Sequence, residues 1–112
     1  MGWWGSVDHR QGSTAMYAVI FRAEIASLDE AYTATAEKLR ELALTRYGCR
    51  EFCSYMEGSR EIAISYWDSE ADIVAWKNDL EHLTAQNRGS ARWYRSYSVQ
   101  VVEVVREYGS SH

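Results

Sequence analysis

Residues 60–73 read REIAISYWDSEADI, and the hydrophobic period changes within this short stretch. Over Arg60–Trp67, isoleucine and tyrosine alternate with alanine, serine and tryptophan, which predicts a β-strand. Ser69 is followed three residues later by Asp72, a pattern that predicts a helix capped by the serine side chain. The next apolar residues recur at helical spacing: Ile73, Trp76, Leu80 and Leu83. The stretch therefore predicts a strand that leads directly into an amphipathic helix.

The residues before this stretch predict a strand, a helix and a hairpin. Met16–Glu24 reads as a strand, and Ser27-Leu28-Asp29-Glu30 predicts a capping box at the start of a helix. The apolar stripe of that helix is Leu28, Tyr32, Ala36, Leu39, Ala43 and Tyr47. We expect Gly48 to stop it. Arg50–Glu57 then predicts a strand, which Gly58-Ser59 joins to the strand described above.

The residues after the 60–73 stretch predict the last elements of the fold. The second helix is expected to end near Asn87-Arg88-Gly89, and a short helical turn to hold Arg92, Trp93 and Tyr94. Ser96–Tyr108 predicts a long final strand. The order β-α-β-β-α-β, with right-handed crossovers, predicts a ferredoxin-like α+β fold. In it a four-stranded antiparallel sheet carries the two main helices on one face.

The uncovered face of this sheet predicts a partner. The first and last strands are apolar on both sides, yet two helices can cover only one face. We therefore expect a homodimer that closes sheet against sheet with twofold symmetry. The final strand is longer than most, and its overhang is expected to reach the partner.

Composition limits the function classes. The chain has 112 residues, 46% of them hydrophobic and 25% charged, which favours one globular domain over a disordered segment. A net charge of −4 argues against a nucleic-acid partner, and no apolar run is long enough to span a membrane. Proline is absent, whereas five Trp, eight Tyr and two Phe are present. These aromatic residues predict either a tightly packed core or a cavity for a flat ligand.

The chain ends and the cysteines complete the domain prediction. Residues 1–15 show no regular period and are expected to form a flexible N-terminal extension before a domain over 16–108 and a tail over 109–112. No apolar signal segment is visible near the N-terminus, which favours the cytoplasm. Cys49 and Cys53 have neither redox nor zinc-site spacing, so we expect free thiols.

The element order and the junction Tyr66-Trp67-Asp68-Ser69-Glu70 resemble the antibiotic biosynthesis monooxygenase family over about residues 16 to 108. The matching pieces are Ser65–Glu70, Ala75–Lys77, Glu81-His82, Ala85-Gln86, Trp93-Tyr94 and Tyr97. The resemblance implies a dimeric α+β barrel. The family includes quinone-forming monooxygenases, haem-degrading enzymes and members with no assigned activity, so the resemblance is more specific for fold than for chemistry.

The resemblance to the monooxygenases implies a reaction without metal, flavin or haem. In that branch a flat aromatic or polyketide-like substrate loses a proton, and the resulting carbanion reacts with oxygen. We therefore expect no cofactor. Trp67 matches the tryptophan that these enzymes place at the strand–helix junction. Their asparagine four residues earlier is Ala63 here, which removes a donor for the developing oxyanion.

The resemblance to the haem-degrading members is weaker. Trp76 can match their tryptophan on the second helix, but ten residues later the chain has Gln86 in place of the haem-ligating histidine. Met16–Glu24 also lacks their asparagine. His82 follows Trp76 by only six residues, so the two side chains point to different sides of a regular helix.

These residues give a predicted site and an alternative to it. We expect His82 to act as general base, because its unperturbed pKa lies near neutrality, and Trp67 to share the catalytic site. The predicted substrate-binding residues are Tyr66, Trp76, Trp93, Tyr94 and Arg92, with no metal ligand. In the alternative, His82 lies exposed on a helix flank and the tryptophans form core. The protein is then a non-catalytic dimeric barrel that binds a small hydrophobic molecule or serves as a regulatory module.

Overall fold

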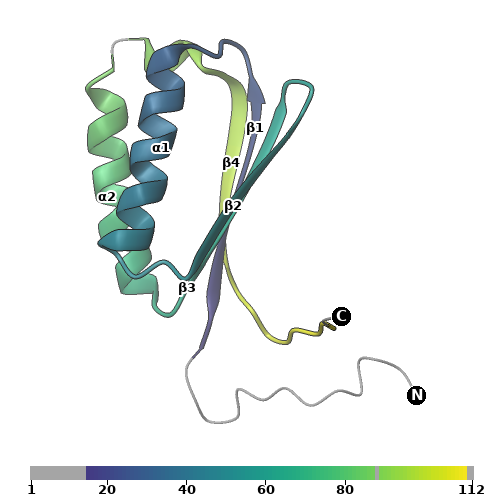
Figure 1. The fold of residues 1–112 in the computed structure, drawn as a ribbon. Helices are drawn as coiled ribbons and strands as arrows, with labels where there is room; N and C mark the ends of the chain where they lie inside the picture. The colour runs from purple at the N-terminus through teal and green to yellow at the C-terminus, as the bar shows by residue number, and fades with distance from the viewer. Residues whose placement is uncertain (1–14, 88, 111–112) are drawn as a thin grey trace.

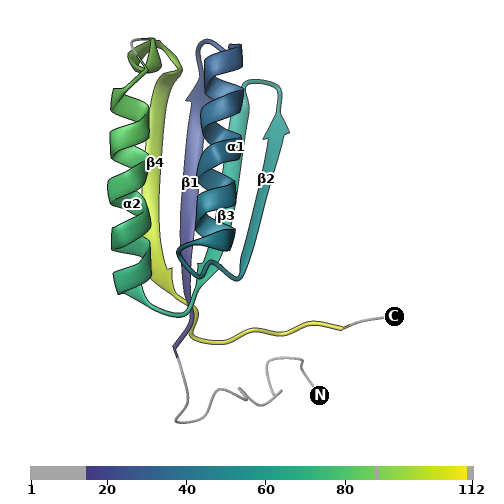
Figure 2. The ribbon, with the colours of Figure 1, turned by 60° about the vertical axis from the view of Figure 1, so that its left-hand side comes forward.

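A computed structural model describes residues 15–87 and 89–110 and shows the predicted βαββαβ order (Figure 1). The elements are β1 (Tyr17–Ile25), α1 (Glu30–Thr45), β2 (Glu51–Glu57), β3 (Arg60–Trp67), α2 (Glu70–Ala85), the 3-10 helix η2 (Ser90–Arg92) and β4 (Tyr94–Glu103). The strands form one antiparallel sheet in the order β2-β3-β1-β4, with both helices on the same face (Figure 2). The ferredoxin-like α+β prediction is confirmed. Most of the predicted N-terminal extension, residues 1–14, lies outside the described residues.

The strand register arranges the helix-facing side of the sheet, here called the inner face, in rows. Successive rows, from the β2–β3 hairpin towards the other end, are Met56-Glu61-Ala23-Tyr97, Ser54-Ala63-Phe21-Val99 and Phe52-Ser65-Val19-Val101. Side chains alternate between faces along each strand, so these rows fix which residues the helices can contact. Glu61 is the only charged residue in these three rows.

The start of α1 differs from the prediction. Asp29, not Ser27, is the N-cap, and its Oδ1 accepts the Tyr32 backbone N–H at 2.8 Å. The Ser27 N–H instead donates to the Trp93 carbonyl at 3.3 Å, which holds this residue in the connection after β1. The predicted stripe is correct at Tyr32 and Ala43, which are buried, but wrong at Leu28 and Ala36, which are exposed. The later start of the helix explains why Leu28 lies outside the packed face.

The start of α2 matches the prediction. Ser69 is the N-cap, and its Oγ accepts the Asp72 backbone N–H at 3.1 Å. Ile73 and Trp76 are buried on the helix face that packs against the sheet, with Leu80 partly buried beside them. The hairpin is also confirmed, with Gly58 at φ +61 in the turn. A positive φ of this kind is the conformation that favours glycine.

The final strand begins and ends earlier than predicted. β4 covers Tyr94–Glu103 instead of Ser96–Tyr108, and η2 holds Arg92 but neither Trp93 nor Tyr94. β1 pairs with β4 from Tyr17 to Ile25, and the Val104 N–H donates to the Met16 carbonyl at 2.8 Å just beyond it. The partner strand thus limits the length of β4, and the following residues leave the sheet as an arm (Figure 1).

In the described part of the chain, no helix covers the outer face of the sheet (Figure 1). Its central rows include the apolar residues Ala18, Ile20, Cys53, Tyr55, Ile62, Ile64, Tyr66 and Val102. This is the two-sided apolar character that the sequence predicted. Within residues 15–87 and 89–110, neither helix has the length and hydrophobicity needed to cross a bilayer.

Candidate functional site

One group of aromatic side chains, the closed aromatic cluster, consists of Phe52, Trp67 and Trp76. The indole rings of Trp67 and Trp76 lie 5.3 Å apart between centroids, and Phe52 meets Trp76 edge to face at 6.1 Å. Both indole N–H groups have acceptors: Trp67 Nε1 donates to Ser65 Oγ at 2.8 Å, and Trp76 Nε1 donates to the Leu39 carbonyl at 2.9 Å. Trp67 has no exposed surface. The cluster is a packed and hydrogen-bonded part of the core.

A second group, the open aromatic cluster, consists of Phe21, Tyr32, Trp93, Tyr94 and Tyr97. Tyr32 meets Trp93 edge to face at 5.1 Å and Tyr94 at 5.7 Å. Tyr94 lies 5.5 Å from both Phe21 and Tyr97, and Phe21 stacks on Tyr97 at 6.0 Å. Trp93 is 2% exposed and Tyr97 is 65% exposed, so the cluster runs from the interior to the solvent.

A carboxylate faces the open aromatic cluster. Glu61 lies on the inner face of β3 and accepts a short hydrogen bond from the Tyr32 hydroxyl of α1. It also accepts one from Ser54 Oγ of β2 at 3.0 Å. Tyr32 therefore joins a helix to a charged group on the sheet. The sequence places Tyr32 in the apolar stripe of the helix and does not single out Glu61, because their pairing depends on the strand register.

Burial shifts the ionisation of Tyr32, which is bonded to this carboxylate, and of its neighbour Tyr94. Burial and, after it, the hydrogen bond to Glu61 raise the pKa of Tyr32 far above its usual value. Burial also raises the pKa of Tyr94, and the neighbouring Tyr32 hydroxyl offsets part of this effect. Both phenols therefore stay protonated at neutral pH and can act as hydrogen-bond donors.

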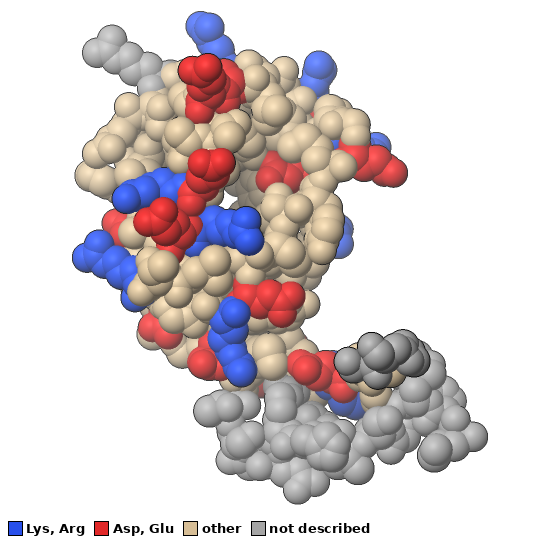
Figure 3. Space-filling view, in the orientation of Figure 1, with Lys and Arg blue, Asp and Glu red and all other residues tan. Residues whose placement is uncertain are grey.

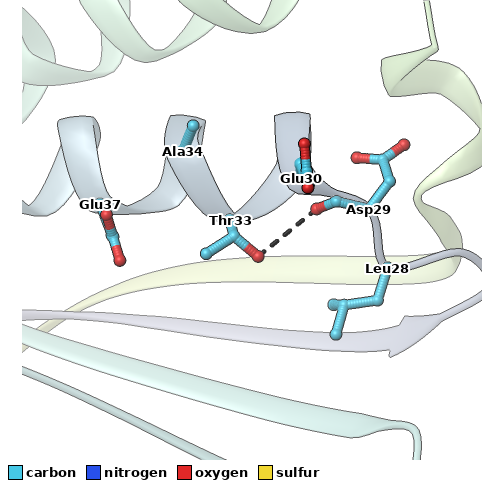
Figure 4. Close-up of a pocket in the computed structure, with 6 residues that line it drawn as sticks. All are labelled: Leu28, Asp29, Glu30, Thr33, Ala34 and Glu37. Carbon is cyan, nitrogen blue, oxygen red and sulfur yellow. Dashed lines mark hydrogen bonds between the residues drawn. The ribbon is translucent and has the colours of Figure 1, made fainter.

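The β4 side of the open aromatic cluster is exposed to solvent, and a separate groove lies along α1. On the β4 side, Tyr97, Val99 and Val101 lie on the inner face yet are 65%, 51% and 46% exposed. In the space-filling view, the surface is hollowed between the helix layer and the sheet (Figure 3). Along α1, an open groove of about 630 Å³ is lined by Leu28, Asp29, Glu30, Thr33, Ala34 and Glu37. In Figure 4, Leu28, just before α1, and Thr33 and Glu37 of α1 extend towards the side on which the strands run.

The chain matches no family model over its length. It is 39% identical over 92 residues to the uncharacterized protein YqjZ of Bacillus subtilis, a match that covers 81% of each protein. The chain belongs to the YqjZ family. This relative carries no function in its name, so the match by itself assigns none.

Solved structures place the family within a known fold. A Nitrosomonas europaea protein provisionally named an antibiotic biosynthesis monooxygenase matches with a TM-score of 0.66 and 16% identity, covering 87% of this chain and 97% of that one. A variant of MhuD, solved with two manganese protoporphyrin IX molecules per active site, matches with a TM-score of 0.54 and 17% identity. That match covers 84% of this chain and 99% of MhuD. The predicted resemblance to the antibiotic biosynthesis monooxygenases is confirmed in the fold.

The structure divides the predicted site residues among four places. Trp93 and Tyr94 lie in the open aromatic cluster, whereas Trp67 and Trp76 lie in the closed one. Tyr66 lies on the outer face, opposite its neighbour Trp67. Arg92 in η2 and His82 on α2 are exposed, and His82 Nε2 lies 3.2 Å from Gln86 Nε2. The structure therefore does not bring His82 and Trp67 together.

The described residues offer little to a metal or a haem. Within residues 15–87 and 89–110, no group of three His, Cys, Asp or Glu side chains could hold a metal ion. A haem iron needs an axial ligand, commonly histidine. His82, the histidine in this part of the chain, is exposed on α2 next to Gln86 and is not part of either cluster. Cys49 and Cys53 are free thiols, and burial raises the pKa of Cys49.

Proposed function

We propose that the protein binds a flat phenolic or keto-aromatic molecule at the open aromatic cluster and oxidises it with dioxygen. The observation that carries this proposal is the Glu61 carboxylate, held among aromatic rings by Tyr32 and Ser54 on the inner face. A carboxylate beside stacking surfaces and neutral phenol donors combines a proton acceptor with a binding site for a flat ring. The fold shared with a provisionally named monooxygenase supports the same class of reaction.

The rings of the open aromatic cluster suit a flat ligand. Phe21 and Tyr97 already stack on each other at 6.0 Å, and the exposed Tyr97 leaves one ring face available. Aromatic pairs with centroids about 4.5 to 7 Å apart contribute roughly 0.5–1.5 kcal/mol beyond the area that they bury. Tyr94 can donate to a ligand oxygen, since burial keeps its hydroxyl protonated. Val99 and Val101 extend the apolar surface along β4.

The proposed reaction balances without an external reductant. An anthrone-type methylene loses one proton to Glu61, and the carbanion adds dioxygen to form a carbon–oxygen bond. The second C–H bond and the O–O bond then break, which leaves a carbonyl and releases water. One oxygen atom is retained in the product and the other is reduced to water, while the carbon is oxidised. The protein binds the ring and accepts the proton.

Binding without catalysis is the second candidate function, and one observation favours it. Ala63, which stands where the resembled monooxygenases carry an asparagine, occupies the row next to Glu61 on the inner face. No amide side chain is therefore available there to stabilise an oxyanion. In this alternative, the same cluster holds a small aromatic molecule that is not turned over.

Oxygen consumption with anthrone tests the proposal. We expect one dioxygen to be consumed per anthraquinone formed, with no added metal or cofactor. Glu61→Gln should lower the rate at least tenfold with little change in binding, because the amide keeps the shape but cannot accept the proton. His82→Ala should keep the rate, since His82 is exposed outside both clusters.

The other outcomes of this assay separate the alternatives. Tight binding of anthrone without oxygen consumption would favour the non-catalytic barrel. Loss of turnover in His82→Ala but not in Glu61→Gln would return the proton-acceptor role to His82. A Soret band on titration with haem, with no response to anthrone, would favour a porphyrin ligand, as in the MhuD structure.

We also propose that the protein forms a homodimer through the outer face of the sheet. The apolar residues Ile20, Ile62 and Ile64 lie side by side there, and neither α1 nor α2 covers them. Burial of such a face in a twofold interface removes it from water. Sedimentation should show a dimer for the wild type and a monomer for Ile64→Lys. The matched variant Val74→Lys, on the exposed side of α2, should stay dimeric. A wild-type monomer would contradict the proposal.

A further inference from the structure

Trp93 carries a buried donor that the fold does not use. The side chain is 2% exposed, and its Nε1 is the buried side-chain polar atom, among residues 15–87 and 89–110, that has no hydrogen-bond partner. A buried N–H without an acceptor is unfavourable, because the group has lost its hydrogen bond to water and gained none in the protein. Trp67 and Trp76, the other buried tryptophans in this part of the chain, both have acceptors at 2.8 and 2.9 Å. The unpaired donor is therefore specific to Trp93.

The main chain, rather than an indole hydrogen bond, holds Trp93 in place. Its carbonyl accepts the backbone N–H groups of Ala26 at 2.7 Å and Ser27 at 3.3 Å. Its own N–H donates to the Ser90 carbonyl at 3.1 Å. Ring packing against Tyr32 at 5.1 Å adds a further constraint. The Trp93 ring is thus held within the open aromatic cluster while its N–H has no partner.

We propose that Trp93 Nε1–H is the specificity-determining donor that binds a carbonyl or phenolate oxygen of the aromatic ligand. The inference rests on the proposed function, because it assumes that the open aromatic cluster binds such a ligand. Tyr94 lies between Trp93, at 6.5 Å, and the exposed Tyr97, at 5.5 Å. For a ligand to reach the Trp93 N–H from the exposed side, the Tyr94 ring must move, because it lies between Trp93 and Tyr97. This N–H supplies the hydrogen bond to the ligand oxygen that the side chain of Ala63 cannot donate.

Selectivity follows from the unpaired donor. An oxygen acceptor recovers the hydrogen bond that the free protein lacks, whereas a hydrocarbon of the same shape leaves the N–H unpaired. The protein should therefore discriminate between two flat ligands of equal size that differ only in ring oxygens. Anthraquinone sulfonate and anthracene sulfonate form such a pair, since both have three fused rings and one sulfonate.

The test compares Trp93→Phe with Trp76→Phe by fluorescence or calorimetric titration of both compounds. Wild type should bind anthraquinone sulfonate more tightly, and Trp93→Phe should lose about five- to tenfold of affinity for it, the size of one net hydrogen bond. Its affinity for anthracene sulfonate should change less than twofold. Trp76→Phe should keep both affinities, although it lowers the unfolding midpoint, because it leaves the Leu39 carbonyl without its indole donor.

A nuclear magnetic resonance titration of the wild type gives an independent result if Trp93→Phe folds poorly. The Trp93 indole N–H signal is assigned as the one that is absent from the spectrum of Trp93→Phe or Trp93→Leu. In the wild type, this signal should move downfield when anthraquinone sulfonate is added and should not move with anthracene sulfonate. An unmoved signal, or an unchanged affinity ratio in Trp93→Phe, would overturn the inference and leave the proposed function intact. If neither compound binds to the wild type, the proposed function fails and the inference fails with it.

Discussion

The closed and the open aromatic clusters lie on the same face of one sheet, yet they differ in whether their buried indole N–H groups have hydrogen-bond acceptors. In the closed cluster, each indole N–H donates to a nearby acceptor and the rings are sealed beneath α1 and α2. In the open cluster, a tryptophan N–H is unpaired, Glu61 is bonded to the buried Tyr32, and the rings extend to the exposed Tyr97. The same residue types therefore build a core at one end and a candidate binding surface at the other.

The largest expected effect tests whether the closed cluster is core. Trp67→Ala should lower the free energy of unfolding by about 3–5 kcal/mol, because it leaves a cavity where a fully buried ring was. Tyr97→Ala, in the open cluster, should change it by about 0.5 kcal/mol or less, since that ring is 65% exposed. Urea denaturation followed by circular dichroism measures both. Equal losses of unfolding free energy in the two variants would contradict the distinction between a core cluster and an open one.

The hydrogen bond beneath Trp67 should have the next largest effect. Ser65→Ala should lower the free energy of unfolding by about 1–3 kcal/mol, because it leaves the buried Trp67 N–H without its acceptor. Ser98→Ala is the matched control, since Ser98 is an exposed strand serine on the outer face of β4. We expect that control to stay within about 0.5 kcal/mol of wild type. A small loss in Ser65→Ala would mean that Trp67 does not depend on this bond.

The bond between Tyr32 and Glu61 tests the polar character of the open cluster. A double-mutant cycle with Tyr32→Phe and Glu61→Gln should give a coupling free energy of about 1 kcal/mol or more, because the acceptor is charged. The same cycle with Tyr47→Phe and Asp79→Asn is the comparison, because this tyrosine–carboxylate pair joins the loop after α1 to α2. Zero coupling for the first pair would contradict the view that Tyr32 anchors the carboxylate.

The smallest expected effect is a difference between wild type and Tyr32→Phe in how stability changes with pH. Unfolded tyrosine ionises near pH 10, whereas burial keeps the folded pKa of Tyr32 well above that value. The folded state therefore gains stability from neutral Tyr32 below about pH 10 and loses it as the pH rises further. Between pH 8 and pH 11, the urea midpoint of unfolding should fall less in Tyr32→Phe than in the wild type. An identical fall in the two proteins would show that Tyr32 ionises equally easily in both states.

The sequence predicted most of the fold because the relevant signals are local. Ser69 caps α2 through a residue three positions away, and Gly58 turns the hairpin within its own neighbourhood. The start of α1 could not be predicted from local signals, because Ser27 and Asp29 are both good N-cap residues. The bond from the Ser27 N–H to the Trp93 carbonyl, a contact between distant parts of the chain, holds Ser27 outside the helix. The early start of β4 has the same origin, since pairing with β1 extends it to Tyr94.

The candidate site depended on contacts between distant parts of the chain. Tyr32 and Glu61 meet only when α1 is laid over the correct row of β3, and neither residue stands out by type. Trp93 and Tyr94 were predicted for binding from their place in the motif. That Trp93 has an unpaired N–H while Trp76 has a paired one follows from three-dimensional packing alone. Histidine drew attention by its chemistry, but His82 is exposed on α2.

The tight turn at Gly58 has a consequence for how this protein can change. Glu61 follows the turn by three residues and faces the helices, whereas its neighbour Ile62 faces outwards. Insertion of one residue before Glu61 with the pairing otherwise kept would exchange the two side chains between the faces. The carboxylate would then enter the apolar outer surface and isoleucine would join the aromatic rings. One short hairpin thus controls both the chemistry of the inner face and the hydrophobicity of the outer one.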